Sequence, residues 1–281
     1  MFADPLASFS IPGLESLVKP VADALGYTVF AKHASEMVLA TAFYHGVFIA
    51  SRYLSPYFLP SYRTLTPKTR VNFDIHVVSH VQSILIVALS YPLFGDKVLA
   101  ENRVYSYTPY AGFITAMALG YFLWDIFICV KFIKVFGVGF LVHGVSAFFV
   151  FLQSTRPFLL FYSPHFLLFE LSTPFLNVNW FASHLPEGTI SFTVQKINGV
   201  LLLSTFFFVR IAWGFYQAFR VAYDVLYLEV ATRQYPLWVA IGVLAANLSL
   251  DFLNVFWFYK MVLLAKRALS TGSGRSSKKT D

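Results

Sequence analysis

The stretch FLLFELSTPFLNVNW, from Phe166 to Trp180, is a nearly continuous apolar run that contains one carboxylate, Glu170. A carboxylate in such a run must be neutral, paired or directed at a polar cavity, because an unpaired charge in hydrocarbon is costly. Glu170, Thr173 and Asn177 follow the spacing i, i+3, i+7 and therefore share one face of a helix. The stretch predicts a membrane-spanning helix with a lipid-facing side and a polar side, kinked at Pro174.

The composition of the whole chain separates this interpretation from the alternative, a soluble core helix with a polar edge. Only 12% of the 281 residues are charged, whereas soluble domains carry about 25%. Windows long enough to span a bilayer occur near 34–51, 71–92, 110–130, 136–155, 158–180, 196–219 and 237–260. The runs are continuous rather than alternating, so we expect an all-α, multi-pass transmembrane bundle of about seven spans rather than a β-barrel.

Three regions follow from this pattern. Residues 1–32 form an N-terminal segment that does not resemble a cleaved signal peptide and contains a candidate interfacial helix near 14–30. Residues 33–268 form the transmembrane domain. Residues 269–281 are small, polar and basic, which is typical of a disordered tail.

The net charge of +7 is concentrated in short clusters beside the expected spans. With seven spans, three of the clusters fall on one side, which the positive-inside rule makes cytosolic together with the C-terminus. Arg220 and Arg233 would then lie on the opposite side and are counter-signals. Nucleic acid is not expected as a partner, because no soluble domain presents the basic residues. The three clusters comprise Arg52, Arg63, Lys68 and Arg70; Lys131 and Lys134; and Lys260, Lys266, Arg267, Arg275, Lys278 and Lys279.

The last residues, Lys278 and Lys279 followed by Thr280 and Asp281, resemble the dilysine retrieval signal of endoplasmic reticulum membrane proteins. Such a signal is read by a receptor and states where a protein resides. It predicts the endoplasmic reticulum membrane as location and coat proteins as partners. The alternative is an ordinary solvated tail.

Nearly every expected span carries a polar stripe, which by default suggests function in a membrane. We expect these side chains to line a pocket, although the asparagines could simply join helices, and Asp251 and Arg210 could form a buried pair. His76 and His80 have helical spacing, but hydrogen-bonded histidines are favoured there and no metal site is expected. The stripe residues are His76, His80, Asp125, His143, Glu170, Asn198, Arg210, Asn247, Asp251 and Asn254.

Four motifs in this order resemble the TLC-domain family: GYFLWDIF at 120–127, LVHG at 141–144, FLLFELSTPFLNVNWF at 166–181 and NGVLLLSTFFFVRI at 198–211. The family includes ceramide synthases, translocation-associated membrane proteins and lipid-homeostasis proteins. The resemblance covers His33 to Ala268, and the ELSTPFLN block looks like the small TLC-domain transmembrane proteins outside the ceramide synthase branch. It implies six helices in a ring around a pocket for a lipid or acyl chain. The positions that match polar family positions are His80, Asp125, His143, Glu170, Asn198 and Arg210.

The same resemblance leaves catalysis open, because ceramide synthases carry two adjacent histidines where this chain has His143 and Gly144. His143 could act alone as a base oriented by Asp125 or Glu170. Arg210 or Asn198 would then clamp a substrate such as acyl-CoA, and no cofactor is expected. Three functions remain open: lipid or acyl-chain binding in lipid homeostasis, ceramide-synthase-like N-acyl transfer, and a cargo or translocation accessory role.

Overall fold

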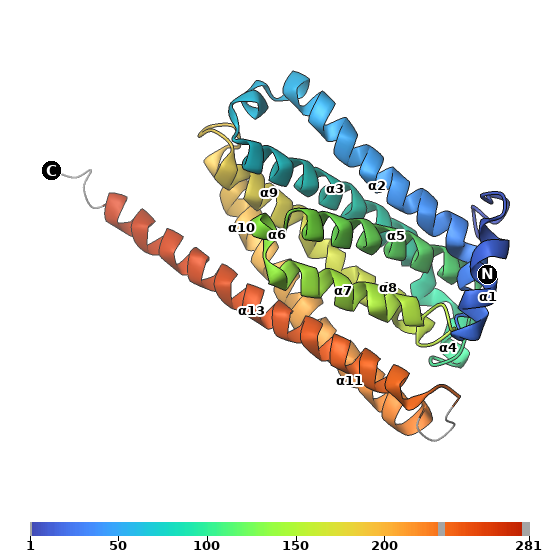
Figure 1. Ribbon diagram of the computed structural model, residues 1–281. Coiled ribbons are helices and arrows are strands. Elements are labelled where there is room, and N and C mark those ends of the chain that lie inside the picture. The colour runs from blue at the N-terminus through green and yellow to red at the C-terminus, as the bar shows by residue number, and fades with distance from the viewer. Residues whose placement is uncertain (1, 230–233, 277–281) are drawn as a thin grey trace.

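The computed structural model describes residues 2–229 and 234–276, and this part of the chain is helical and contains no β-strand (Figure 1). Short 3-10 turns at Pro60–Thr64, Tyr91–Gly95, Leu160–Tyr162 and Leu168–Ser172 and π-helical segments at Phe207–Ala212 and Val225–Glu229 connect or interrupt the helices. The α-helices are α1 (Leu14–Ala24), α2 (Phe30–Phe58), α3 (Pro67–Ser90), α4 (Lys97–Glu101), α5 (Pro109–Lys131), α6 (Ile133–Phe136), α7 (Val138–Gln153), α8 (Ser163–Leu167), α9 (Thr173–His184), α10 (Phe192–Phe206), α11 (Trp213–Asp224) and α13 (Leu237–Ser276).

Six of the seven predicted windows fall mainly on one helix or on a helix with its π-helical or 3-10 continuation, and 158–180 falls on several short helical segments. Within the described residues, four helices are long and apolar enough to cross a membrane: Pro67–Gly95, Pro109–Lys131, Phe192–Tyr227 and Leu237–Arg267. Helix α7 is apolar but has 16 residues, about 24 Å at 1.5 Å per residue, which is shorter than a bilayer core of about 30 Å. The prediction of an all-α membrane bundle is confirmed.

The helices form a closed ring. Helix α3 contacts α5 and α9, α5 contacts α7, and α7 contacts α13. The ring closes because α13 contacts α10 and α11, and α10 contacts α9. Helix α2 packs outside this ring against α3 and α5, and α13 extends beyond the bundle toward the C-terminus (Figure 1). Among the described helices, the ring has six members, which agrees with the ring that the resemblance implied. They are α3, α5, α7, α13, α10 with α11, and α9 with α8.

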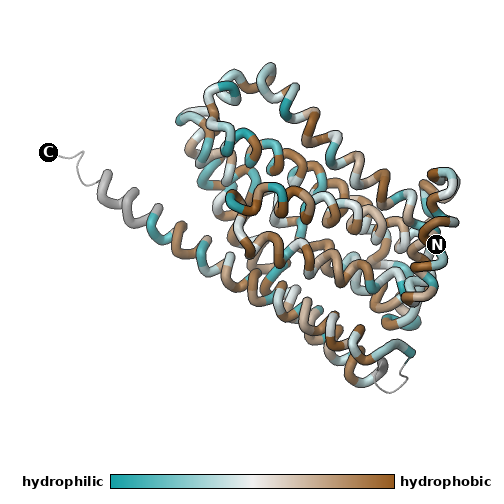
Figure 2. Tube along the Cα trace, viewed as in Figure 1, coloured by the Kyte–Doolittle hydropathy of each residue, from teal (hydrophilic) through white to brown (hydrophobic). Residues whose placement is uncertain are grey.

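Helix α5 is the most deeply packed of the candidate spans, with 67% of its most apolar window buried inside the protein. Gly120 permits this close approach, because a Cβ atom there would lie 2.5 Å from Cβ of Ala40 on α2. The outer helices instead expose apolar side chains such as Phe208, Leu248 and Phe252, and hydrophobic positions extend over their length in Figure 2. Outward apolar faces of this kind are expected where helices contact lipid.

The stretch from Phe166 to Trp180 differs from the single helix that we expected. Helix α8 ends at Leu167, a 3-10 turn occupies Leu168–Ser172, and α9 begins at Thr173. Pro174 lies in the first turn of α9, where its missing N–H costs no helical hydrogen bond. The expected disturbance therefore lies in the turn before the proline, which contains Glu170.

The terminal regions also differ in detail from the expectation. Helix α1 forms within the predicted stretch and packs against α2, while its interfacial position remains a prediction. Helix α13 continues to Ser276, beyond residue 268, where we placed the start of a disordered tail. The predicted retrieval signal, Lys278 and Lys279, lies outside the described residues.

Candidate functional site

Arg210 is the centre of the polar interior. It lies in the π-helical segment Phe207–Ala212 and is 8% exposed. A π-helical turn changes the direction of the side chains that it carries, and such turns occur frequently at functional sites. The guanidinium carbon lies 5.3 Å from the ring centre of Phe206, so the cation also contacts an aromatic face.

The broken helix opposite supplies most of the hydrogen-bond acceptors for Arg210. Its Nε donates to the carbonyl oxygen of Phe169 at 3.1 Å and to Oγ of Ser172 at 3.0 Å. Its Nη2 donates to Oγ1 of Thr173 at 3.2 Å and lies 3.5 Å from Oε1 of Glu170. The 3-10 turn thus directs a backbone carbonyl, a hydroxyl and a carboxylate to one cation.

Helix α13 completes the cluster. Nη1 of Arg210 donates to Oδ1 of Asn254 at 3.4 Å. Asp251, one turn earlier, is buried but forms no ion pair with Arg210. The alternative of an Asp251–Arg210 pair is therefore wrong, and Glu170 takes that place.

A cavity of about 50 Å³ adjoins this cluster. A smaller cavity of about 20 Å³ shares Val150, Phe151, Phe166 and Asn247 with it, so the two spaces are neighbours along α7 and α13. The larger cavity has a polar side and an aromatic side. Its lining residues are Phe122, His143, Ala147, Val150, Phe151, Phe166, Leu167, Phe169, Glu170, Arg210, Asn247, Leu250 and Asn254.

The structure brings together five of the predicted site residues at this cavity: His143, Glu170, Arg210, Asn247 and Asn254. They come from α7, the 3-10 turn, the π-helical segment and α13, so four separate segments meet there. Asn247 lines both cavities. Polar side chains of four separate segments therefore meet at one cavity.

In the described part of the chain, no side chain orients Nδ1 of His143. Its Nδ1 is buried without a hydrogen-bond partner in the described part of the chain, and its ring packs against Trp257 at 5.4 Å. Asp125 is outside the cavity lining and accepts a weak contact from Sγ of Cys129 at 3.9 Å. A base needs an orienting group within hydrogen-bond reach, and none is bonded to this imidazole nitrogen among the described residues.

The packing of α7 against α5 leaves little space for a side chain at Gly144. A Cβ atom at this position would lie 2.9 Å from Oδ2 of Asp125, so a side chain there requires Asp125 to move. A second histidine beside His143, as in ceramide synthases, would therefore displace the carboxylate of Asp125 from its present position.

The remaining predicted residues lie away from the cavity lining. His76 bonds through Nδ1 to Oδ1 of Asn177 at 2.8 Å, which joins α3 to α9. Asn198 donates to the carbonyl oxygen of Phe175 at 2.9 Å, which joins α10 to α9. Nδ1 of His80 is buried without a hydrogen-bond partner among the described residues. For His76 and Asn198 the structure supports the helix-joining interpretation rather than a pocket role.

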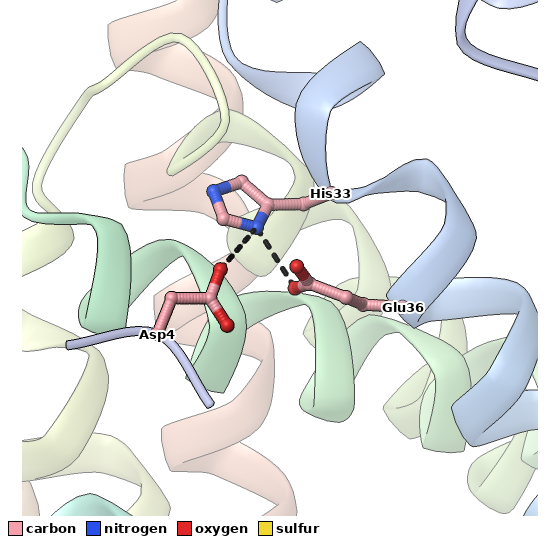
Figure 3. Close-up of side chains that lie close together, drawn as sticks. All are labelled: Asp4, His33 and Glu36. Carbon is pink, nitrogen blue, oxygen red and sulfur yellow. Dashed lines mark hydrogen bonds and ion pairs between the residues drawn. The ribbon is translucent and has the colours of Figure 1, made fainter. Parts of the chain in front are cut away.

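A second polar cluster was not found from the sequence (Figure 3). Nδ1 of His33 lies 2.8 Å from Oε2 of Glu36 and 4.0 Å from Oδ2 of Asp4, and its Nε2 lies 2.8 Å from the hydroxyl of Tyr107. Burial near these carboxylates raises the pKa of Tyr107 to about 12. The i, i+3 spacing of His33 and Glu36 was a visible signal. The approach of Asp4 to His33 depends on the path of the N-terminal segment, and the sequence contained no signal for it.

An ion pair at another position was also missed. Nη2 and Nε of Arg103 donate to the two carboxylate oxygens of Asp224 at 2.7 and 2.8 Å. The hydroxyl of Tyr162 donates to the same carboxylate at 2.5 Å. The contact fixes the loop before α5 to the end of α11, and its residues are too far apart in sequence to be paired by spacing.

Comparison with known proteins agrees with the fold. The family model described as TLC domain matches residues 72–263. An uncharacterized TLC domain-containing protein of Schizosaccharomyces pombe is 39% identical over 255 residues, 90% of this chain and 86% of the relative. Topoisomerase I damage affected protein 4 of Saccharomyces cerevisiae is 30% identical over 244 residues, 84% of this chain and 85% of the relative.

A human relative is also similar over most of its length. TLC domain-containing protein 4 of Homo sapiens is 27% identical over 223 residues, 76% of this chain and 81% of the relative. The matched region 72–263 contains the 3-10 turn Leu168–Ser172, the π-helical segment Phe207–Ala212 and both cavities. The resemblance seen in the four sequence motifs is confirmed, and the chain belongs to the TLC-domain family.

Proposed function

We propose that this membrane protein binds a single lipid or acyl chain inside the helix ring and acts in membrane lipid homeostasis without catalysing a reaction. One observation carries the proposal: the polar cluster of Glu170, Arg210 and Asn254 borders a cavity whose other side is apolar. A site with a few polar groups and an apolar remainder matches an amphipathic ligand. The cation at Arg210 would bind a phosphate or carboxylate head group.

The acyl chain would follow the two neighbouring cavities. Phe151 and Phe166 line both, and Val221 and Val243 extend the smaller one along α11 and α13. A volume of about 50 Å³ holds only a few water molecules. Binding of a chain therefore requires the phenylalanine side chains to move apart, which a ring of separate helices permits.

Lipid analysis of the purified protein tests this proposal. The full chain is purified in a mild detergent, and co-purified lipids are measured by mass spectrometry. The substitution Val150→Phe fills the space between the cavities. Val145→Phe adds the same volume on the exposed side of α7 and is the matched control.

We expect about one lipid molecule per chain to co-purify with the wild type and with Val145→Phe. This lipid should be lost from Val150→Phe. Equal lipid contents in the three proteins would contradict binding within the ring. Thermal unfolding of each protein distinguishes loss of lipid from loss of the fold.

A ceramide-synthase-like N-acyltransferase is the second candidate function. It is favoured by the position of His143, whose Nδ1 has no partner among the described residues and which borders the same cavity as Glu170. Membranes are incubated with a labelled sphingoid base and acyl-CoA, using wild type and His143→Ala. If the protein is not a catalyst, membranes with either variant should form no more N-acylated product than membranes that lack the chain. Turnover that requires His143 would instead establish the enzyme.

The proposed location is the endoplasmic reticulum membrane, with a cytosolic C-terminus whose Lys278 and Lys279 bind coat proteins. The sequence at the terminus and the basic residues after the last span support this location. Replacement of both lysines by serine should move a fluorescently tagged protein, labelled at its N-terminus, to later compartments. Pull-downs with and without the last four residues also test the cargo or translocation accessory role, the third function that the sequence left open.

A further inference from the structure

The cluster around His33 lies in the N-terminal part of the chain, outside the region matched by the family model. Asp4 belongs to the segment before α1, while His33 and Glu36 lie in the first turns of α2. The side chains of Asp4, His33 and Glu36 are only 6%, 6% and 3% exposed. Figure 3 shows both carboxylates directed at the same ring nitrogen.

The two carboxylates of this cluster have no basic partner other than His33 among the described side chains. Among the side chains that the structure describes, in residues 2–227 and 234–267, no lysine or arginine forms an ion pair with Asp4 or Glu36. One imidazolium could balance only one of the two carboxylates. Buried charges are stable when they are paired or coordinate a metal, and a divalent ion would balance both carboxylates while His33 stays neutral.

The ligand atoms are close to the positions that a metal requires. Nδ1 of His33, a carboxylate oxygen of Asp4 and one of Glu36 all lie within 4.8 Å of one another. Two ligands about 2.1 Å from a tetrahedral zinc ion are about 3.4 Å apart. The His33–Glu36 separation of 2.8 Å would have to widen and the His33–Asp4 separation of 4.0 Å would have to shorten, each by about 0.6 Å.

The surroundings of His33 fit the role of a metal ligand. Metal-bound histidines usually donate their other ring N–H to a fixed partner. Nε2 of His33 lies 2.8 Å from the hydroxyl of Tyr107, which can accept this hydrogen bond. Gly112 on α5 adjoins the imidazole so closely that a Cβ atom there would overlap the ring. The ring orientation is therefore fixed by a hydrogen bond on one side and by backbone on the other.

We propose that Asp4, His33 and Glu36 bind one divalent metal ion, with zinc as the best match to one imidazole and two carboxylates. The donor set contains no thiolate, and nitrogen and oxygen donors suit zinc in four-coordinate sites. A water molecule would take the fourth position. The ion would fasten the N-terminal segment to α2. This site is separate from His76 and His80, and it does not depend on the proposed lipid function.

Metal content of the purified full chain tests the proposal. The protein in detergent is stripped with a chelator, equilibrated with micromolar zinc sulfate and measured by mass spectrometry, and affinity is measured against a chromophoric chelator. Glu36→Gln and Asp4→Asn each remove one ligand charge, and the amide oxygen introduced by Glu36→Gln can still accept a hydrogen bond from His33. Glu15→Gln, an exposed change in α1, and His165→Gln, which removes a buried histidine elsewhere, are the matched controls.

We expect about one zinc ion per chain in the wild type and in both controls, and an affinity at least tenfold lower in Glu36→Gln and Asp4→Asn. Zinc should also raise the unfolding temperature of the wild type but not that of Glu36→Gln. If Asp4→Asn fails to fold, Glu36→Gln alone decides the result. Wild-type protein that retains no more zinc than Glu36→Gln would overturn the proposal.

Discussion

Replacement of Arg210 by methionine tests whether this cation holds the interior of the ring together. The change keeps much of the length of the side chain but removes the hydrogen bonds to Phe169, Ser172, Thr173 and Asn254. It also leaves the carboxylate of Glu170, whose side chain is 14% exposed, without its partner. The substitution therefore removes one charge and isolates another.

The expected magnitude follows from the geometry. At 3.5 Å and an effective dielectric constant of about 20, the attraction between Arg210 and Glu170 is about 5 kcal/mol before desolvation. Removing one member of a buried pair typically costs about 3 to 5 kcal/mol. We expect Arg210→Met to lower the free energy of unfolding by about 4 kcal/mol. For a chain of this size that corresponds to a fall of roughly 10 °C in the unfolding temperature.

Replacement of the partner residue, Glu170, should cost less stability than replacement of Arg210, because the two residues have different numbers of other contacts. In Glu170→Gln the guanidinium keeps four other acceptors, so we expect a loss of about 1 to 2 kcal/mol. The double variant should be more stable than Arg210→Met alone, because it no longer contains the isolated carboxylate. Arg63→Met, at an exposed arginine, is the control and should change the unfolding temperature little.

Thermal unfolding of the detergent-purified variants, followed by intrinsic fluorescence, measures these differences. If Glu170→Gln is as destabilising as Arg210→Met, the ion pair alone carries the stability and the hydrogen-bonded cluster does not. If the double variant shows the sum of the two single losses, the residues act independently and the reasoning is refuted.

Three further predictions concern other parts of the chain. Asp224→Asn should cost about 3 kcal/mol, because it breaks the two-point contact with Arg103, and chemical denaturation should show a matching fall in stability. Gly120→Ala should cost about 1 to 3 kcal/mol through overlap with Ala40, whereas an unchanged unfolding temperature would show that α2 and α5 can separate freely. The pKa of Tyr107 is raised to about 12, so its contribution to stability is complete below pH 10 and is lost as the pH rises toward 12. The difference in 295 nm absorbance between wild type and Tyr107→Phe should show this late titration, and a midpoint near pH 10 would contradict it.

Much of the ring could be predicted from the sequence, because lipid and protein interior impose different side chains on opposite helix faces. The seven apolar windows and the polar stripes follow from that contrast. Five stripe residues do meet at the larger cavity. His76 and Asn198 do not line this cavity. A polar stripe shows only that one face of a helix avoids lipid, and that face can pack against another helix as well as border a cavity.

The choice of partners could not be predicted. Glu170 and Asp251 are nearly equally distant from Arg210 in sequence, and both lie on polar faces. Which of them meets the guanidinium depends on the 3-10 turn before Pro174 and on the π-helical segment that carries Arg210. Such irregular turns have weak sequence signals, since they are stabilised by tertiary contacts rather than by local propensity. The position of Asp4 beside His33 has the same origin.

The two irregular segments contact each other inside the ring. Backbone that departs from the α-helix is tolerated at membrane depth only where protein or a cavity replaces the missing partners. Here the carbonyl oxygen of Phe169 in the 3-10 turn accepts a hydrogen bond from Nε of Arg210, which the π-helical segment carries. His143 lies on the regular helix α7 and has no polar partner at Nδ1 among the described residues. On the proposed function, an anionic head group would interact with Arg210, and its recognition would need no base at His143.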